Sequence, residues 1–210
     1  MLVLLFTAGL LMGILAKWIS ILMIRHRKGD VSGSKILGGV YSGLIWALIS
    51  GTSYLIIGLV FSGDQLKITE CAFVLSVCMA LSAVDFQVKK IPNELLLTLL
   101  VFKIAMLIIS KESLFDAIFG MLFAGVAFLF PAKFGKTIGM GDIKLAMIVG
   151  FYLGPVGFVQ TMAIMGVCLL IYWGYLSITD KGGLKTSAAL GPYISLGFFI
   201  TLCVSIPIRI

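Results

Sequence analysis

Two aspartates stand out in this chain because each borders a strongly apolar segment. Asp142 directly follows two near-adjacent glycines in the string Gly139-Met140-Gly141-Asp142-Ile143-Lys144-Leu145, at the start of one such segment. Asp85 ends a long apolar run. An ionisable group at membrane depth costs about 2.5–3.5 kcal/mol on insertion scales, so it is a functional hypothesis by default. Asp85 and Asp142 are therefore candidates for a catalytic pair.

Two carboxylates that meet in a medium of low dielectric cannot easily both ionise, so they share a proton. The ionised member takes a proton from water, which attacks a peptide carbonyl, and the protonated member hydrogen-bonds the developing oxyanion. Gly139 and Gly141 lack a Cβ, which lets an extended peptide approach Asp142 closely. The pattern predicts a membrane-embedded aspartyl protease whose catalytic residues are Asp85 and Asp142.

Each of these residues also has a plainer interpretation. An aspartate after a glycine-rich turn often caps a helix, as Asp142 could. Asp85 could be an interfacial acid beside Lys89 and Lys90, and Lys144 could anchor its helix at the interface or hold a nearby charge. Paired intramembrane acids also build proton relays, so a proton-coupled transporter is the alternative function. A transporter would usually show internal repeats, and we find no convincing repeat.

Composition places the chain in a membrane. Of its 210 residues, 60% are hydrophobic and 12% charged, and the mean hydropathy is +1.16; soluble domains carry about 25% charged residues. We expect a polytopic, all-α integral membrane bundle in which lipid covers the apolar surface. The length suits a single membrane-embedded domain over residues 1–210.

The remaining composition argues against nucleic-acid, metal and cofactor binding. The net charge is +7, but the basic residues fall in short loops without aromatic interleaving, where they fix membrane orientation. The four cysteines lie inside apolar segments without a Cys-x-x-Cys pair, and the lone His26 sits in a basic loop. We therefore expect no nucleic acid, no metal and no cofactor, with membrane lipid as a partner.

A membrane helix needs about 20 mostly apolar residues. About eight spans are predicted, with six to eight as the range: 1–24, 36–61, 68–85, 92–110, 114–132, 142–154, 156–178 and 188–208. Ten basic residues fall in the alternate loops assigned to the cytoplasm, and three fall in the outer connections and at the C-terminus. This asymmetry places Asp85 and Asp142 on the same, cytoplasmic side.

Three strings in order resemble one known family. The stretch Asp85-Phe86-Gln87-Val88-Lys89-Lys90-Ile91-Pro92-Asn93 resembles the first-aspartate motif of type IV prepilin peptidases, with its Ile-Pro-Asn. The string that begins at Gly139 matches the second motif, Gly-x-Gly-Asp-x-Lys-Leu. Leu190-Gly191-Pro192-Tyr193 is similar to the Gly-Pro-(Phe/Tyr) string of the last span. The motif-bearing part covers about 71–200.

The resemblance implies an aspartic endopeptidase of a prokaryotic cytoplasmic membrane, with its active site facing the cytoplasm. Such enzymes remove basic leaders from type IV prepilins, pseudopilins and related proteins. It implies Asp85 and Asp142 as the catalytic dyad. The active-site loop and substrate-positioning residues would be Gly139, Gly141, Lys144, Pro92, Asn93, Gly191 and Pro192.

This chain departs from the family pattern at two places. Many bacterial members have a longer first cytoplasmic loop with zinc-binding Cys-x-x-Cys pairs, and they also N-methylate the new N-terminus. Here the loop over 25–35 is short and holds no cysteine, so zinc is not expected and N-methyltransferase activity is doubtful. Ala189 stands where the family often has proline. The sequence leaves open the oligomeric state and the pathway of the substrate, whether pilus assembly, secretion or DNA uptake.

Overall fold

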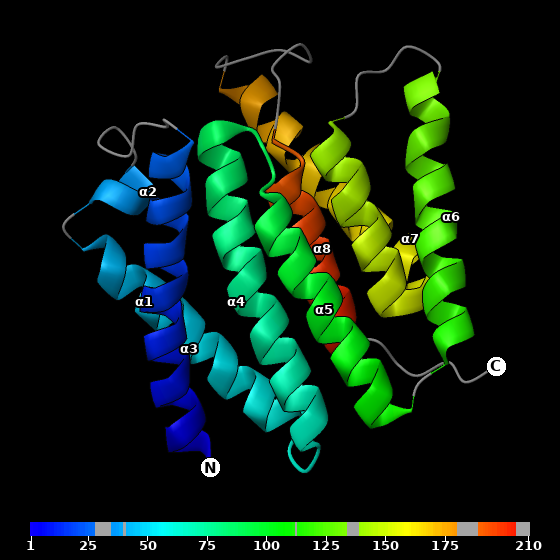
Figure 1. Cartoon of the computed structure of the whole chain (residues 1–210). Coiled ribbons are helices and arrows are strands. Elements are labelled where there is room, and N and C mark those ends of the chain that lie inside the picture. Colours follow the sequence, from blue (N-terminus) through cyan, green and yellow to red (C-terminus); the bar gives the residue numbers. More distant parts are fainter. Residues whose placement is uncertain (28–34, 40, 112, 134–138, 180–188, 205–210) are drawn as a thin grey trace. The chain divides into compact units, whose positions relative to one another are not determined.

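The computed structural model describes residues 1–27, 35–39, 41–111, 113–133, 139–179 and 189–204. These residues form α-helices and no strand, which confirms the all-α prediction (Figure 1). The helices are α1 (Leu2–His26), α2 (Lys35–Gly38), α3 (Ser42–Val60), α4 (Gln65–Val88), α5 (Asn93–Ser110), α6 (Leu114–Lys133), α7 (Met140–Ile178) and α8 (Gly191–Val204).

Six of the described helices are long and apolar enough to cross a membrane: α1, α3, α4, α5, α6 and α7. Large apolar side chains such as Val3, Ile108 and Phe115 are about three-quarters exposed, as expected where lipid is the solvent. α8 has 14 described residues and a length of about 21 Å, shorter than the predicted run over 188–208. Residues 205–210 of that run lie outside the described part of the chain. The chain is a multi-pass helical membrane protein.

The structure corrects the predicted boundaries of the second and third runs. The run over 36–61 is divided into α2 and α3, because Gly38 and Gly39 interrupt it and glycine is a poor helix former. The run over 68–85 was expected to stop at Asp85, but α4 continues to Val88. The helix ends instead where Lys89 adopts the left-handed conformation, at φ 52° and ψ 38°.

Contacts within the chain divide it into two compact units, Met1–Glu112 and Ser113–Ile210, which we call unit 1 and unit 2. The single-domain organisation expected from the sequence stays a prediction. In unit 1, α4 is the most buried span. The Tyr54 hydroxyl of α3 lies 3.0 Å from the Ala72 carbonyl and 2.8 Å from the Ser76 hydroxyl, both on α4.

Unit 2 is built around a reversal inside α7. Gly154 has φ 69° and ψ −177°, which is not helical, and Pro155 follows. A Cβ built on Gly157 would lie 2.6 Å from the Leu153 Cβ, whereas Cβ atoms four residues apart in a helix are about 5–6 Å apart. α7 therefore consists of two helices, 140–153 and 155–178, which agrees with the separate runs predicted from the sequence.

Aromatic contacts show that the second part of α7 turns back along α6. Gly120 of α6 packs against Gly150 at close backbone distance. The Phe158 ring then lies 6.0 Å from Phe123 and 6.2 Å from Phe128, toward the C-terminal end of α6. If α7 were straight and antiparallel to α6, Phe158 would lie toward the N-terminal end of α6 instead. Figure 1 shows the turn in yellow and the return in amber and orange.

Candidate active site

Asp85 lies in the last turn of α4 and is only 4% exposed. Its main-chain carbonyl accepts the Lys89 N–H at 2.8 Å, and this bond closes the helix just before the left-handed Lys89. The Asp85 side chain is thus held by a helix rather than by a loop. A buried carboxylate at the end of a span is compatible with the predicted chemistry, and the catalytic role of Asp85 stays a prediction.

Pro92 and Asn93 lie in the turn that follows Asp85 in unit 1. Pro92 was expected at the first helical position of the next span, but it is the N-cap of α5, with extended backbone at φ −70° and ψ 128°, and Asn93 is the first helical residue. Pro92 is buried and Asn93 is exposed. An ion pair of 3.3 Å between Arg27 and Glu94 joins the end of α1 to the start of α5.

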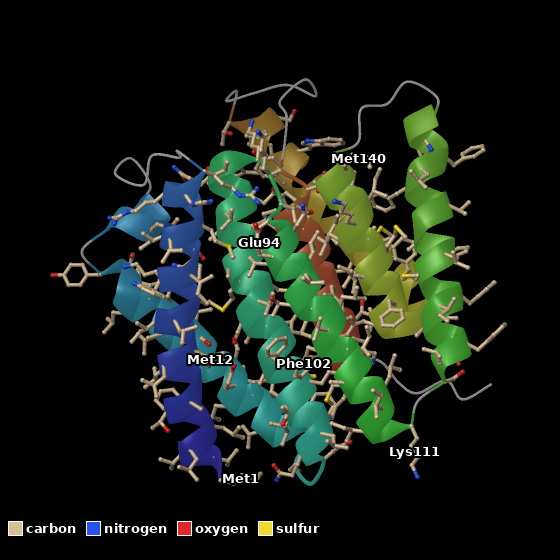
Figure 2. All side chains as sticks on the ribbon, in the orientation of Figure 1. Met1, Met12, Glu94, Phe102, Lys111 and Met140 are labelled. Atoms are coloured by element: carbon tan, nitrogen blue, oxygen red, sulfur yellow. The ribbon has the colours of Figure 1, made fainter. Side chains whose placement is uncertain are left out.

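This end of unit 1 therefore gathers basic residues as well as the first motif. The Arg27–Glu94 ion pair places the end of α1 beside the turn that carries Lys89 and Lys90. Figure 2 shows Glu94 toward this end of unit 1 and Met1 and Lys111 at the opposite end. The structure thus brings Asp85, Pro92 and Asn93 to the basic end of unit 1.

Asp142 lies in the first turn of α7 and is half-buried. The N-cap position belongs to Gly139, whose carbonyl accepts the N–H groups of Asp142 at 3.0 Å and Ile143 at 3.2 Å. Asp142 therefore does not have the N-cap role that the plainer interpretation would give it. Its place in the first turn still favours a negative charge, because the helix dipole is positive there.

Gly139 makes room for the carboxylate of Asp142. A Cβ built on Gly139 would lie 2.8 Å from Asp142 Oδ2 and 3.7 Å from Cγ, so the carboxylate folds back over the glycine. The sequence predicted that Gly139 lets a substrate backbone approach, and the structure adds that the Asp142 carboxylate itself lies close to the position that a Cβ would take. Met140 is 67% exposed at the end of unit 2 where α7 begins (Figure 2).

The other residues of the second motif lie on the same turn. Gly141 is half-buried and Lys144 is exposed. An exposed lysine at the start of a span is compatible with interfacial anchoring. The charge-holding role of Lys144 stays a prediction.

Gly191 and Pro192 open α8 in unit 2. The Leu190 carbonyl accepts the N–H groups of Tyr193 at 3.1 Å and Ile194 at 3.0 Å, so Pro192 falls in the first turn, where its missing N–H costs no helical bond. Contacts Tyr172–Tyr193 and Thr161–Thr201 show that α8 runs antiparallel to the second part of α7.

The order of the helices places the second and third motifs at one end of unit 2. The first part of α7 leads away from Asp142, the second part returns, and α8 leads away again (Figure 1). Gly191 and Pro192 therefore start at the end where Asp142 lies. The first motif belongs to unit 1 and the other two belong to unit 2, so the pairing of Asp85 with Asp142 stays a prediction.

One pair of buried charged residues was not predicted from the sequence. Glu70 and Lys103 are each 2% exposed, and Lys103 Nζ lies 3.0 Å from Glu70 Oε1. They fall inside two consecutive predicted spans, 68–85 and 92–110. Opposite charges within neighbouring antiparallel spans were the signal that could have found them.

Comparison with known proteins supports the resemblance seen in the motifs. The model of the type IV leader peptidase family matches residues 72–174, a stretch that contains both Asp85 and Asp142. Gly191 and Pro192 lie beyond it. The searches of the curated proteins and of the solved structures found no match. Over residues 72–174, this chain belongs to the type IV leader peptidase family.

Proposed function

We propose that this protein is a membrane aspartyl endopeptidase that cleaves the basic leader of type IV prepilins, pseudopilins or related proteins at the cytoplasmic face of the membrane. Membership in a leader peptidase family supports a protease of this type. The observation that carries the proposal is that both motif aspartates sit at helix ends, with Asp85 buried in the last turn of α4 and Asp142 in the first turn of α7.

In the proposed mechanism the two carboxylates meet around one water molecule and share a proton. The ionised carboxylate removes a proton from water as the water oxygen attacks the scissile carbonyl. The protonated carboxylate donates a hydrogen bond to the oxyanion and then passes its proton to the leaving amine. Gly139 has no Cβ beside the Asp142 carboxylate, and the exposed residue Asn93 is proposed to contact the substrate backbone.

The test is cleavage of a leader-bearing, prepilin-like substrate co-expressed with wild type, Asp85→Asn or Asp142→Asn. We expect wild type to release the leader and both variants to release none. Each variant replaces one carboxylate by an amide of nearly the same size, so the charge is lost while the shape of the side chain is kept. Cleavage by both variants would refute the dyad. A transporter would instead show pH-driven uptake in liposomes and no proteolysis.

Two other aspartates provide matched controls. Asp64 is the N-cap of α4, at the end of that helix opposite Asp85, and its side chain accepts the Lys67 N–H at 3.0 Å. Asp116 lies in the first turn of α6, close to Gly154 and so at the end of unit 2 opposite Asp142. We expect Asp64→Asn and Asp116→Asn to cleave at the wild-type rate.

A further inference from the structure

Three charged side chains are buried among the described residues: Glu70, Asp85 and Lys103. Of these three residues, only Asp85 takes part in the proposed mechanism. Lys103 Nζ of α5 lies 3.0 Å from Glu70 Oε1 of α4, and both side chains are 3% exposed. Lys67 Nζ, 26% exposed and one turn away on α4, lies 3.2 Å from Glu70 Oε2. The Glu70–Lys103 ion pair therefore links two spans, whereas Lys67–Glu70 stays within one helix.

This ion pair sets a definite register between α4 and α5. From Glu70 to Asp85 the rise along α4 is about 22 Å, and from Lys103 back to Asn93 the rise along α5 is about 15 Å. With Glu70 and Lys103 at one level, the last turns of α4 reach beyond the start of α5. The connection from Lys89 to Pro92 then runs back along α4, as Figure 1 shows.

A ring contact lies at the same level as the ion pair. Phe73 and Phe102 stack with centroids 3.8 Å apart, one turn from Glu70 and next to Lys103, respectively. Spans in lipid have little hydrophobic reason to prefer one register over another, because lipid is as apolar as their side chains. A buried ion pair adds little stability over well-packed apolar residues, and specifying register is its best-attested use.

We infer that Glu70 and Lys103 are positioning residues, which hold α4 against α5 at the register that places Asp85 beyond the start of α5. The pair acts at the far end of the α4–α5 hairpin from Asp85 and does not touch the reacting atoms. The inference concerns the register itself, and its effect on catalysis rests on the proposed function.

The enzymatic test compares Glu70→Gln, Lys103→Met and the double variant. Glu70→Gln leaves the buried Lys103 charge without Glu70, and Lys103→Met leaves the buried Glu70 charge with Lys67 alone. We expect lower thermal stability from both, and the larger loss from Glu70→Gln. The double variant removes both charges, and we expect it to recover wild-type stability. If the pair sets register, the double variant still loses at least tenfold in kcat with KM within twofold of wild type. Full recovery of kcat in the double variant would overturn the inference.

Lys67→Gln is the matched control, because it removes a charge from the same cluster without touching the bond between helices. We expect its kcat to equal that of wild type. A loss of kcat in Lys67→Gln equal to that of the double variant would show that local charge, rather than register, matters, and would contradict the inference.

A distance measurement tests the register without any cleavage. Spin labels at Phe86 on α4 and Leu97 on α5, each about 60% exposed, report the sliding of one helix along the other in a background with the four cysteines replaced. We expect double electron–electron resonance to give one narrow distance for the intact pair and a shifted or broader distribution for the double variant. Identical distributions would overturn the inference. A wild-type protein that cleaves no leader would instead refute the proposed function and leave this measurement valid.

Discussion

Replacing Gly139 with alanine should displace the Asp142 carboxylate without straining the backbone dihedral angles of residue 139. Gly139 has φ −62° and ψ 134°, which alanine adopts without strain. The added Cβ would lie 2.8 Å from Asp142 Oδ2, and ordinary contacts begin at 3.4 Å. The Asp142 carboxylate must therefore shift by about 0.6 Å, or the first turn of α7 must open by a similar amount.

The expected effect on catalysis follows from this displacement. A misplacement of about 1 Å at a reacting group can cost about 100-fold in rate. A shift of about 0.6 Å should then lower kcat/KM by about tenfold, or about 1.4 kcal/mol of transition-state stabilisation. Stability should fall by about 0.5–1 kcal/mol, because alanine is much less favoured than glycine at an N-cap.

The assay is cleavage of a leader-bearing substrate by purified protein, with thermal unfolding measured in parallel. Gly166→Ala and Gly174→Ala are the matched controls, because a Cβ at either position meets nothing within 4 Å. Both controls should cleave at the wild-type rate. If Gly139→Ala also cleaves at the wild-type rate, the carboxylate of Asp142 does not need its present position and our reasoning about the site is wrong.

Three further substitutions test the fold around the site, each by its melting temperature. Gly154→Ala should destabilise the protein by about 1–3 kcal/mol, because its φ of 69° and ψ of −177° belong to a region that is essentially restricted to glycine; an unchanged melting temperature would argue against the reversal in α7. Gly120→Ala should also lower the melting temperature, because its Cβ would collide with the Gly150 carbonyl and force α6 away from α7. Arg27→Gln should cost at most about 1 kcal/mol, because its ion pair with Glu94 is largely exposed; a larger loss would mean that this contact organises the first motif.

Much of the fold was predictable because it depends on local composition. Apolar runs long enough to cross a bilayer located the main spans, and the Gly154-Pro155 pair located the reversal, since proline cannot continue a helix and glycine alone tolerates the required φ. The motif strings around Asp85 and Asp142 identified the family that the comparison then confirmed. Each of these signals lies within one continuous stretch of the sequence.

Helix ends were less predictable. Asp85 looked like the end of its span because it is the first charge after an apolar run, yet α4 continues to Val88. The helix ends where Lys89 adopts the left-handed conformation. This end could not be predicted from the sequence, because glycine or asparagine usually occupies such a position and lysine has no preference for it. Likewise, Pro92 was predicted to be the first residue of α5, but its backbone is extended and α5 begins one residue later, at Asn93.

The sequence by itself determined that the protein is a helical membrane protein of a leader peptidase family, and it singled out the two acids on which the proposed chemistry depends. Only the tertiary structure decided that Glu70 of α4 pairs with Lys103 of α5, and that the Asp142 carboxylate lies over Gly139. The physical reason is that the first set of properties depends on the type and spacing of neighbouring residues. The second set depends on how far one helix slides along another and on which way a side chain folds, and these are settled only when the helices pack.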